Sequence, residues 1–408
     1  MSRGKWGLSR GNVEETDVLV VGAGPTGLIA GREAARRGVN VTVLEEHEEI
    51  GVPCHCAGLL SIRGLKEIGV EPSDEFVQNE VSGAVFHSPS DLTFEIRGRE
   101  KMAYVVDRVT FDKALARQAV SAGVELRLGF KAERFLMKKG VVSGVVGENK
   151  ETIRAKVVID AEGSGCRLLK MVDFEKPNPE GFLQATQLEV AEVKPDSDLV
   201  EIFVGSMVAP KFFLWVIPTG ADSARVGLAC KDRKRYNLLK NFVENKLGKH
   251  RTTAVRAGCV ITSGPSARTC HDGVIIVGDA AGQTKPTTGG GVVTGGICAS
   301  IAGEVAAEAV LKDDPSAGFL RKYEDLWRRR LGREFSLMLL ARKILNRLSD
   351  DTIDGIFKEI VKSRLQGAIE EEGDIDFQSK VLRRLARQPP LLKILLRVAG
   401  DILFKKPG

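Results

Sequence analysis

A short segment near the start of the chain most constrains its fold. The apolar residues 17–21 run into a glycine, a helical stretch follows over 25–37, and a second apolar run occupies 39–44. Valine and leucine dominate both apolar runs, which is typical of strands that are buried on both faces of a parallel sheet. The order therefore predicts a strand–helix–strand unit, and with it an α/β fold.

The turn between the first strand and the helix has the sequence Gly22-Ala-Gly24-Pro-Thr-Gly27. In such a turn Gly22 permits the tight bend, Gly24 lets backbone amides approach a pyrophosphate, and Gly27 lets the helix pack closely on the strand. Glu45 ends the second strand about 20 residues further on, where a carboxylate can bind a ribose. The pattern predicts a Rossmann-like dinucleotide site without choosing between NAD and FAD. The alternative is a glycine turn that binds no ligand.

A second apolar strand runs into an acidic, glycine-rich turn at 274–282, Val-Ile-Ile-Val-Gly-Asp-Ala-Ala-Gly. The segment resembles the corresponding part of flavoproteins with two dinucleotide folds, in which the aspartate, here Asp279, hydrogen-bonds the ribityl chain of FAD. The alternative is an aspartate that only caps a helix. The resemblance favours FAD as the cofactor.

A third strand of this kind covers 157–165, and Asp107-Arg108 precedes a helical stretch over 108–121. These features together resemble the p-hydroxybenzoate-hydroxylase-like superfamily of flavoproteins. In that superfamily an arginine at the position of Arg108 reaches the flavin or its phosphates. The alternative is a surface arginine that begins the helix.

Three further segments narrow the resemblance to the geranylgeranyl reductase family. They are Gly-Val-Pro-Cys-His-Cys-Ala-Gly-Leu at 51–59, Pro-Lys-Phe-Phe-Leu-Trp-Val-Ile-Pro at 210–218 and Pro-Thr-Thr-Gly-Gly-Gly-Val at 286–292. The chain is most similar to the archaeal members that saturate the isoprenoid chains of membrane ether lipids. Phe213 replaces the signature tyrosine and Ile217 its second aromatic residue, so we expect a more apolar pocket.

The resemblance implies an FAD-dependent oxidoreductase that saturates carbon–carbon double bonds of geranylgeranyl chains in archaeal-type ether phospholipids. Reduced flavin supplies the hydride in such an enzyme, while the protein supplies orientation and a dry cavity. Cys56 and Ala57 are expected beside the flavin ring, with Cys56 as a catalytic thiol. Gly291 and Val292 are expected to offer helix N-terminal amides to the pyrimidine edge of the flavin. The alternative for these glycines is close packing alone.

The strand predicted around 213–217 offers large apolar side chains. Side chains alternate along a strand, so Phe213, Trp215 and Ile217 share one face. We expect this face to line an elongated pocket for the prenyl chain, since each buried methylene contributes about 0.8 kcal/mol. The alternative is an ordinary core strand.

Seven cysteines are scattered over the chain, an odd number that favours free thiols and a reducing compartment. Cys54 and Cys56 could ligate a metal, form a disulfide or remain thiols. Because no second Cys/His pair at zinc spacing accompanies them, no metal site is predicted. His55 is interpreted as a loop histidine rather than a general acid.

Two other functions fit parts of this pattern, and the electron donor stays open. The chain could be an FAD monooxygenase of the same fold that acts on a small aromatic compound, or a lipid-binding flavoprotein without activity. Within the reductases, geranylgeranyl diphosphate is the alternative substrate. Ferredoxin, a reduced flavin carrier and NAD(P)H are all candidate donors.

The distribution of these motifs predicts a discontinuous organisation. The FAD-binding domain comprises 17–80, 101–175 and 256–310, after a flexible N-terminus at 1–16. Residues 81–106 and 183–230 are expected to form antiparallel strands, and the substrate-binding sheet domain comprises 81–100 and 176–255. From 292 onward the pattern is helical, so that 311–408 form a C-terminal helical region.

Composition and charge restrict the partners of the protein. A net charge of +6 among 408 residues lacks the dense basic stripe of a nucleic-acid binder. The longest uncharged run, 286–303, is too glycine-rich for a membrane span, which needs about 20 apolar residues. Residues 391–403 form a basic amphipathic pattern that suits either a membrane interface or packing on the protein. We therefore expect a cytoplasmic protein with peripheral contact at the inner face of the membrane.

Overall fold

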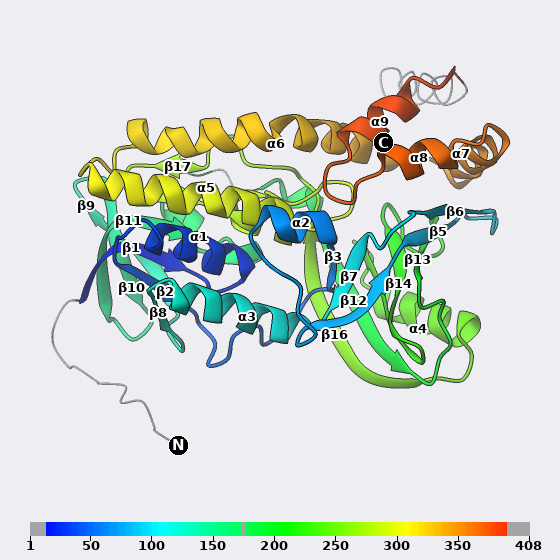
Figure 1. Ribbon diagram of the computed structural model, residues 1–408, viewed down its shortest axis with the longest axis horizontal. Helices are drawn as coiled ribbons and strands as arrows, with labels where there is room; N and C mark the ends of the chain where they lie inside the picture. The colour runs from blue at the N-terminus through cyan, green and yellow to red at the C-terminus, as the bar shows by residue number, and fades with distance from the viewer. Residues whose placement is uncertain (1–13, 173, 175–176, 390–408) are drawn as a thin grey trace.

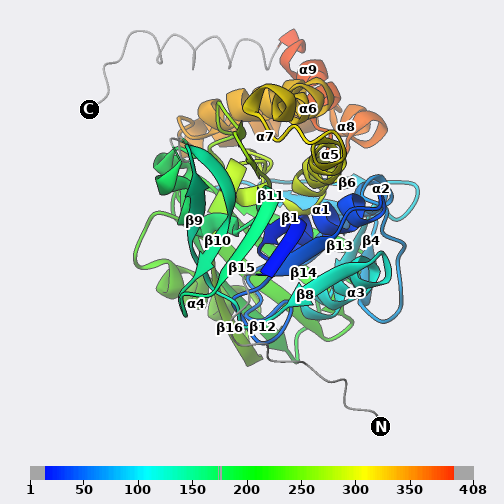
Figure 2. The ribbon, with the colours of Figure 1, turned by 90° about the vertical axis from the view of Figure 1, so that its left-hand side faces the viewer.

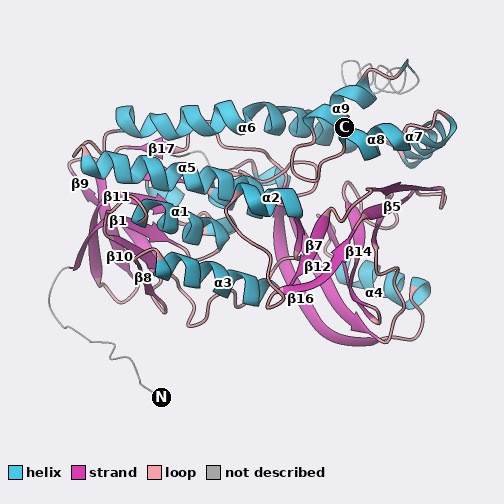
Figure 3. Cartoon of the chain, viewed as in Figure 1, coloured by secondary structure: helices cyan, strands magenta, loops and turns pink. Residues whose placement is uncertain are grey.

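The computed structural model describes residues 14–172, 174 and 177–389, which form two sheet-containing lobes beneath a layer of helices (Figure 1). An eight-stranded sheet builds one lobe and a seven-stranded sheet builds the other, with a three-stranded sheet where they meet (Figure 3). The predicted α/β class with an antiparallel sheet and C-terminal helices is confirmed.

The eight-stranded sheet contains the predicted strand–helix–strand unit. Strand β1 (Glu14–Val21) pairs in parallel with β2 (Val41–Leu44) and with β11 (Thr152–Asp160), and α1 (Pro25–Ala35) is the crossover. The remaining strands are β8 (Val124–Arg127), β9 (Ala132–Lys138), β10 (Val141–Gly147), β17 (Cys270–His271) and β18 (Val274–Ile276). Strands β1, β2, β11 and β18 confirm the apolar strands predicted from the sequence.

Strand β1 begins earlier than the expected boundary at residue 17. Glu14 pairs with Ile153 and Thr16 with Ala155, so the segment 14–16 belongs to the sheet and not to a flexible terminus. Polar side chains are tolerated there because this end of β1 is only partly buried. The rest of the expected flexible N-terminus, residues 1–13, lies outside the described residues.

The seven-stranded sheet forms the second lobe. In spatial order its strands are β16 (Arg251–Ile261), β12 (Phe182–Ala191), β15 (Ser223–Cys230), β14 (Phe213–Gly220), β13 (Leu199–Val204), β5 (Gly83–His87) and β6 (Thr93–Arg97). All neighbours are antiparallel except β13 and β5, which are parallel. These two strands are far apart in the sequence, so no hairpin forces them to run in opposite directions.

One face of this sheet is covered by α4 (Arg235–Lys246), whose Leu239 and Val243 are buried against it. The opposite face carries the buried side chains of Trp215 and Ile217 and turns toward the small sheet. That small sheet consists of β3 (Leu59–Ser61), β7 (Ala103–Val106) and β4 (Val77–Val81). The fold therefore leaves the predicted substrate strand facing the junction of the two lobes.

Two strands of the small sheet each run into a helix. Helix α2 (Ile62–Glu67) follows β3, and α3 (Arg108–Ser121) follows β7. The carboxylate of Asp107 accepts a hydrogen bond from the Thr110 amide at 2.8 Å and caps α3. The predicted helix over 108–121 is confirmed.

Helix α5 (Val292–Leu311) packs between α1 and α6 (Ala317–Leu345), above the eight-stranded sheet (Figure 2). Within the described residues it is the one helix with the length and hydropathy of a membrane span, and 72% of that window is buried inside the protein. A Cβ on Gly303 would clash with the carbonyl oxygen of Ala30 in α1. The missing side chain lets the two helices approach closely, as the glycine-rich sequence predicts.

The chain ends in α7 (Asp350–Lys362), α8 (Gln366–Glu372) and α9 (Ser379–Ala386). These helices contact both lobes: Phe357 of α7 packs on Phe94 of β6, while α9 packs on α6. The predicted helical character from residue 292 is confirmed through Ala386. The amphipathic segment predicted at 391–403 lies outside the described residues.

Substituting Gly303→Ala tests the contact between α1 and α5. The added methyl group must push two backbones apart, and overpacking of this kind costs about 1–3 kcal/mol. We expect a lower free energy of unfolding in urea. The control is Gly332→Ala in α6, where the new Cβ would approach only Arg328, at 3.8 Å, and where alanine adds up to about 1 kcal/mol of stability. Equal stability of Gly303→Ala and the wild type would contradict this account.

Candidate functional site

The turn between β1 and α1 has the geometry of a pyrophosphate cradle. Gly22 has φ +98°, and a Cβ there would clash with the carbonyl oxygen of Ala161 at the end of β11. A Cβ on Gly27 would clash with the carbonyl oxygen of Gly22, whereas one on Gly24 would meet nothing within 4 Å. The turn is thus packed against the protein at Gly22 and Gly27, and the space beside Gly24 is open. Among the residues that the structure describes, no side chain caps the amides that begin α1, so they are available to an anion.

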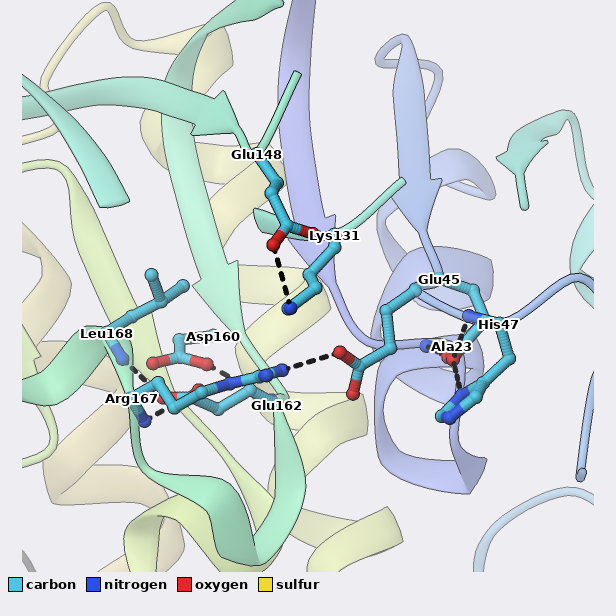
Figure 4. A network of polar contacts seen from close by, with 10 residues as sticks. Ala23, Glu45, His47, Lys131, Glu148, Asp160, Glu162, Arg167 and Leu168 are labelled. Atoms are coloured by element: carbon cyan, nitrogen blue, oxygen red, sulfur yellow. Dashed lines mark hydrogen bonds and ion pairs between the residues drawn. The ribbon is translucent and has the colours of Figure 1, made fainter. Parts of the chain in front are cut away.

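Glu45 lies beside this turn, as the sequence predicts. Its Oε2 accepts a hydrogen bond from the Ala23 amide at 2.9 Å, and its Oε1 contacts Nδ1 of His47 at 2.6 Å (Figure 4). The contact with Ala23 fixes the carboxylate next to the glycine turn. A ribose attached to a pyrophosphate in the turn would lie within reach of this carboxylate.

A second group of acids lies at the end of β11, on the same edge of the sheet (Figure 4). Asp160 is fully buried, and its Oδ2 has no hydrogen-bond partner within the described residues. Burial and the nearby Glu162 raise the pKa of Asp160 well above its ordinary value. Glu162 accepts hydrogen bonds from the amides of Arg167 and Leu168 at 2.7 and 2.9 Å. Its carboxylate therefore holds the loop after β11 in place.

Asp279 follows β18 in a short 3₁₀ turn, Gly278–Ala281, and approaches the start of α5. A Cβ on Gly291 would lie 2.8 Å from its Oδ1, so the glycine is required for this approach. Burial raises the pKa of Asp279 to about 6, and Arg108 partly opposes that rise. The carboxyl accepts no hydrogen bond from the residues that the structure describes, which leaves it available to a hydroxyl-rich ligand. The interpretation of Asp279 as a simple helix cap is not supported.

Arg108 begins α3, but its side chain is only 11% exposed, so the surface arginine considered from the sequence is wrong. Its guanidinium forms a two-pronged ion pair with Asp112 one turn further along α3, with N···O distances of 3.0–3.1 Å. Burial by itself would lower the pKa of Arg108, but Asp112, Cys56 and Cys54 raise it above its ordinary value. The same arginine acts on Asp279. Three segments that are distant in sequence thus meet around one charge.

The cysteine loop lies at the junction of the lobes. Cys54 and Cys56 are both free thiols and both partly buried, and Sγ of Cys56 accepts a hydrogen bond from the Gly58 amide at 3.4 Å. Burial raises the pKa of Cys54. The disulfide considered from the sequence is absent from the described residues, which also contain no cluster of three or more candidate metal ligands. His55 contacts the carbonyl oxygen of Ala257 in β16 at 2.6 Å, which fits its interpretation as a loop histidine.

Arg225, which the sequence analysis missed, ties this loop to the second lobe. Its Nη1 donates to the carbonyl oxygens of Ala57 and Val106, both at 2.9 Å, and its Nη2 donates to Gln78 at 2.6 Å. The side chain is buried on the inner face of β15. A single charged residue within the apolar run 223–230 was the available signal, because a buried charge in a strand needs specific partners.

The three residues predicted to share a strand face belong to one apolar cluster. Trp215 and Ile217 are buried, and Phe213 is partly buried with its ring edge-on to Trp215 at 6.0 Å. The indole Nε1 of Trp215 donates to Gln187 at 3.1 Å, so its one polar atom is satisfied. Ala57 packs against the same cluster. The apolar face and the cysteine loop are therefore adjacent.

The residues present fit FAD. The cradle open at Gly24 and the uncapped start of α1 suit a pyrophosphate, and Glu45 is in place for the adenosine ribose. Asp279 has a free carboxyl for the ribityl hydroxyls, and α5 begins at Val292 after the uncapped residue Gly291. A helix N-terminus at that place suits the electron-rich edge of a reduced flavin. These four features come from separate segments that lie close together: Glu45 contacts the glycine turn, Gly278 lies against Thr26 of α1, and Gly291 lies against Asp279. We call this place the FAD site.

Comparison with known proteins agrees with this geometry. The model of an FAD binding domain matches residues 15–325. A digeranylgeranylglycerophospholipid reductase of Methanopyrus kandleri is 35% identical over 93% of this chain and 98% of its own length. One from Methanocaldococcus jannaschii is 35% identical over 92% of this chain and 96% of its own length. The chain belongs to the digeranylgeranylglycerophospholipid reductase family. Like its relatives it is an FAD-dependent oxidoreductase.

A solved structure shows the same fold. It is a geranylgeranyl bacteriochlorophyll reductase-like protein from Thermoplasma acidophilum, 30% identical, with a TM-score of 0.85 over 95% of this chain and 100% of the other. The likeness covers both lobes and the C-terminal helices. It agrees with the resemblance carried by segments 51–59, 210–218 and 286–292.

Substituting Asp279→Asn tests the assignment of this carboxyl to the cofactor. A charge-assisted hydrogen bond contributes roughly 1.5–3 kcal/mol, so we expect FAD to bind at least about tenfold more weakly. Without FAD, burial in the folded wild type raises the pKa of Asp279 from 3.8 to about 6. The wild-type apoprotein therefore loses stability as the pH rises between these values, and the variant loses less.

Flavin fluorescence titration measures the affinity, and urea unfolding at several pH values measures the stability. The matched control is Asp313→Asn, since Asp313 is exposed and follows the C-terminal end of α5, whereas Asp279 lies at the N-terminal end of that helix. Unchanged FAD affinity in Asp279→Asn would remove Asp279 from the cofactor site.

Proposed function

We propose that this protein saturates carbon–carbon double bonds in the geranylgeranyl chains of archaeal-type ether phospholipids. The observation that carries the proposal is the adjacency of the cysteine loop, the FAD site and the apolar face of β14. Ala57, next to Cys56, packs in the same cluster as Trp215 and Ile217. A long hydrocarbon chain held against this face would place an alkene beside the FAD site.

The apolar cluster supplies binding and excludes water. Phe213, Trp215 and Ile217 present hydrocarbon surface to the chain, and the only polar atom among these side chains is satisfied by Gln187. An isolated alkene makes no hydrogen bonds, so its affinity must come from burial of methylene groups. Phe213 stands where the resemblance to the family predicts a tyrosine, and the missing hydroxyl makes this surface more apolar.

Reduction of the alkene requires a hydride at one carbon and a proton at the other. FAD, when bound and reduced, supplies the hydride. We assign the proton to Sγ of Cys56, which leaves a thiolate when the new C–H bond forms. The guanidinium of Arg108 stabilises that negative charge, since the two groups already interact electrostatically. A proton from solvent then restores the thiol.

The direct test is an anaerobic incubation of dithionite-reduced protein with digeranylgeranylglyceryl phospholipid, followed by mass spectrometry. We expect successive additions of two hydrogens and reoxidation of the flavin. A parallel arm with geranylgeranyl diphosphate distinguishes the alternative substrate. Ferredoxin, a reduced flavin carrier and NAD(P)H then replace dithionite one at a time and identify the donor.

Cys56→Ser and Cys54→Ser form the matched pair for the proton donor. We expect Cys56→Ser to slow the chemical step by at least about 100-fold, since general acid catalysis contributes roughly 10²–10⁴-fold. Cys54→Ser should have a much smaller effect.

Oxygen-dependent hydroxylation of an aromatic compound, without alkene reduction, would instead identify a monooxygenase. Failure of every prenyl lipid to reoxidise the flavin would indicate a lipid-binding flavoprotein.

We further propose that the protein acts in the cytoplasm, peripherally bound at the inner face of the membrane. Arg333 and Leu340 are seven residues apart and therefore lie on one face of α6, and Arg347 lies in the turn that follows this helix. All three are exposed, Leu340 by 55%. Lys343 is exposed on the same part of the helix. Exposed leucine among basic side chains suits an anionic lipid surface.

Co-sedimentation with anionic and neutral vesicles tests membrane binding. We expect the triple variant Arg333→Gln, Lys343→Gln, Arg347→Gln to bind anionic vesicles at least tenfold more weakly, because each basic residue contributes about 1 kcal/mol. The control is Lys240→Gln with Lys249→Gln in and after α4, on the opposite side of the molecule from α6 (Figure 1). Equal weakening by both sets, or no binding by the wild type, would contradict this surface.

A further inference from the structure

We propose that the C-terminal helical region positions the loop beside the flavin, through a buried ion pair between Lys285 and Asp376. The loop comprises 285–291 and leads directly into α5, and we name it the flavin-edge loop. Asp376 lies between α8 and α9, nearly a hundred residues away in the sequence. It is a positioning residue, since it acts on the cofactor site through Lys285.

The ion pair is short and shielded from water. Nζ of Lys285 lies 2.6 Å from Oδ1 of Asp376 and also donates to the carbonyl oxygen of Ile375 at 3.1 Å. The side chains of Lys285 and Asp376 are only 8% and 3% exposed. A buried charge that loses its partner is strongly destabilised, so the pair holds its two segments together.

The second carboxylate oxygen of Asp376 connects the pair to α2. It accepts a hydrogen bond from the hydroxyl of Ser61, which itself caps α2 by accepting from the Gly64 amide at 2.8 Å. A Cβ on Gly64 would lie 2.5 Å from Oδ2 of Asp376. The carboxylate is therefore enclosed by three segments and has no room to turn away from Lys285.

The backbone of the flavin-edge loop folds around Lys285. The Lys285 amide donates to the carbonyl oxygen of Gly290 at 3.0 Å, and its own carbonyl oxygen accepts from the Gly289 amide at 2.7 Å. Fixing the Lys285 side chain thus fixes the turn of glycines that ends at Gly291. Gly291 immediately precedes α5 and its unpaired amides.

Two further contacts join the C-terminal helices to this loop. Arg342 of α6 is buried and donates to the carbonyl oxygens of Pro286, at 2.9 Å, and of Thr287. Oγ1 of Thr287 donates to Gln378 at 2.7 Å. Both Arg342 and Gln378 belong to the C-terminal region, and both bind the flavin-edge loop. Helix α6 and the segment between α8 and α9 therefore hold the flavin-edge loop in addition to covering the lobes.

The position of the flavin-edge loop should affect both the affinity for FAD and the midpoint potential of the flavin. A loop held in place keeps the amides at the start of α5 aimed at the flavin, where their partial positive charge favours the reduced, anionic form. A loosened loop would bind FAD more weakly and lower the flavin midpoint potential. A contact with a purely structural role would change stability and leave the potential of bound FAD unchanged.

The test compares Asp376→Asn, Lys285→Met and the double variant with the wild type. For each single variant we expect FAD to bind at least tenfold more weakly, the midpoint potential to fall, and amides 287–291 of the apoprotein to exchange hydrogen faster. If the two residues act as a pair, the double variant should be no worse than the single variants.

Arg63→Gln is the matched control. It removes an exposed ion pair, Arg63–Asp374, that joins α2 to the same loop between α8 and α9 and spares the buried pair. We expect wild-type FAD affinity and potential. These readouts do not involve alkene reduction, so they are independent of the proposed substrate.

Folded Asp376→Asn protein with unchanged FAD affinity and midpoint potential would overturn the proposal. The same shift in Arg63→Gln would also overturn it. If Asp376→Asn does not fold, Thr287→Val decides, because it removes only the hydrogen bond to Gln378. We expect a roughly threefold weaker affinity for FAD and faster exchange in 287–291, and wild-type values for both would refute the role of the C-terminal region.

Discussion

The close backbone contact around the N-terminus of α1 is the constraint on which the site depends. Gly22 lies against the end of β11, and Gly27 lies against Gly22 itself. Further along, Gly303 lets α5 lie on α1. No residue with a Cβ could occupy these positions without separating the segments. Because the segments are this close, the start of α1, the end of β11 and the start of α5 lie together at one site.

Buried charged side chains then determine how the other segments are arranged around that site. Arg108 is paired with Asp112, Arg225 binds the cysteine loop, and Lys285 is paired with Asp376. Such groups contribute little net stability, since desolvation opposes their attraction. Their value lies in specificity, because any other arrangement leaves a charge buried without a partner. Each one connects segments that are distant in the sequence.

The lobes have different physical characters that match their roles. The first lobe offers backbone amides and carboxylates, which suit a cofactor rich in phosphate and hydroxyl groups. The second lobe offers a sheet face of aromatic and aliphatic side chains, which suits hydrocarbon. The cysteine loop lies where the two meet, and Arg225 holds it there through Ala57 and Val106. The C-terminal helices contact both lobes and the loop beside the flavin.

The sequence by itself determined the parts that depend on local pattern. Apolar runs and the glycine turn define the strand–helix–strand unit, and alternation along β14 places Phe213, Trp215 and Ile217 on one face, because both signals arise within a few neighbouring residues. The burial of Arg108 and the roles of Arg225, Lys285 and Asp376 were decided only by the tertiary structure. Asp376 lies in a polar segment with no distinguishing pattern, and its importance comes from a partner 91 positions away. Contacts of that kind depend on how whole elements pack, which no local pattern in one sequence records.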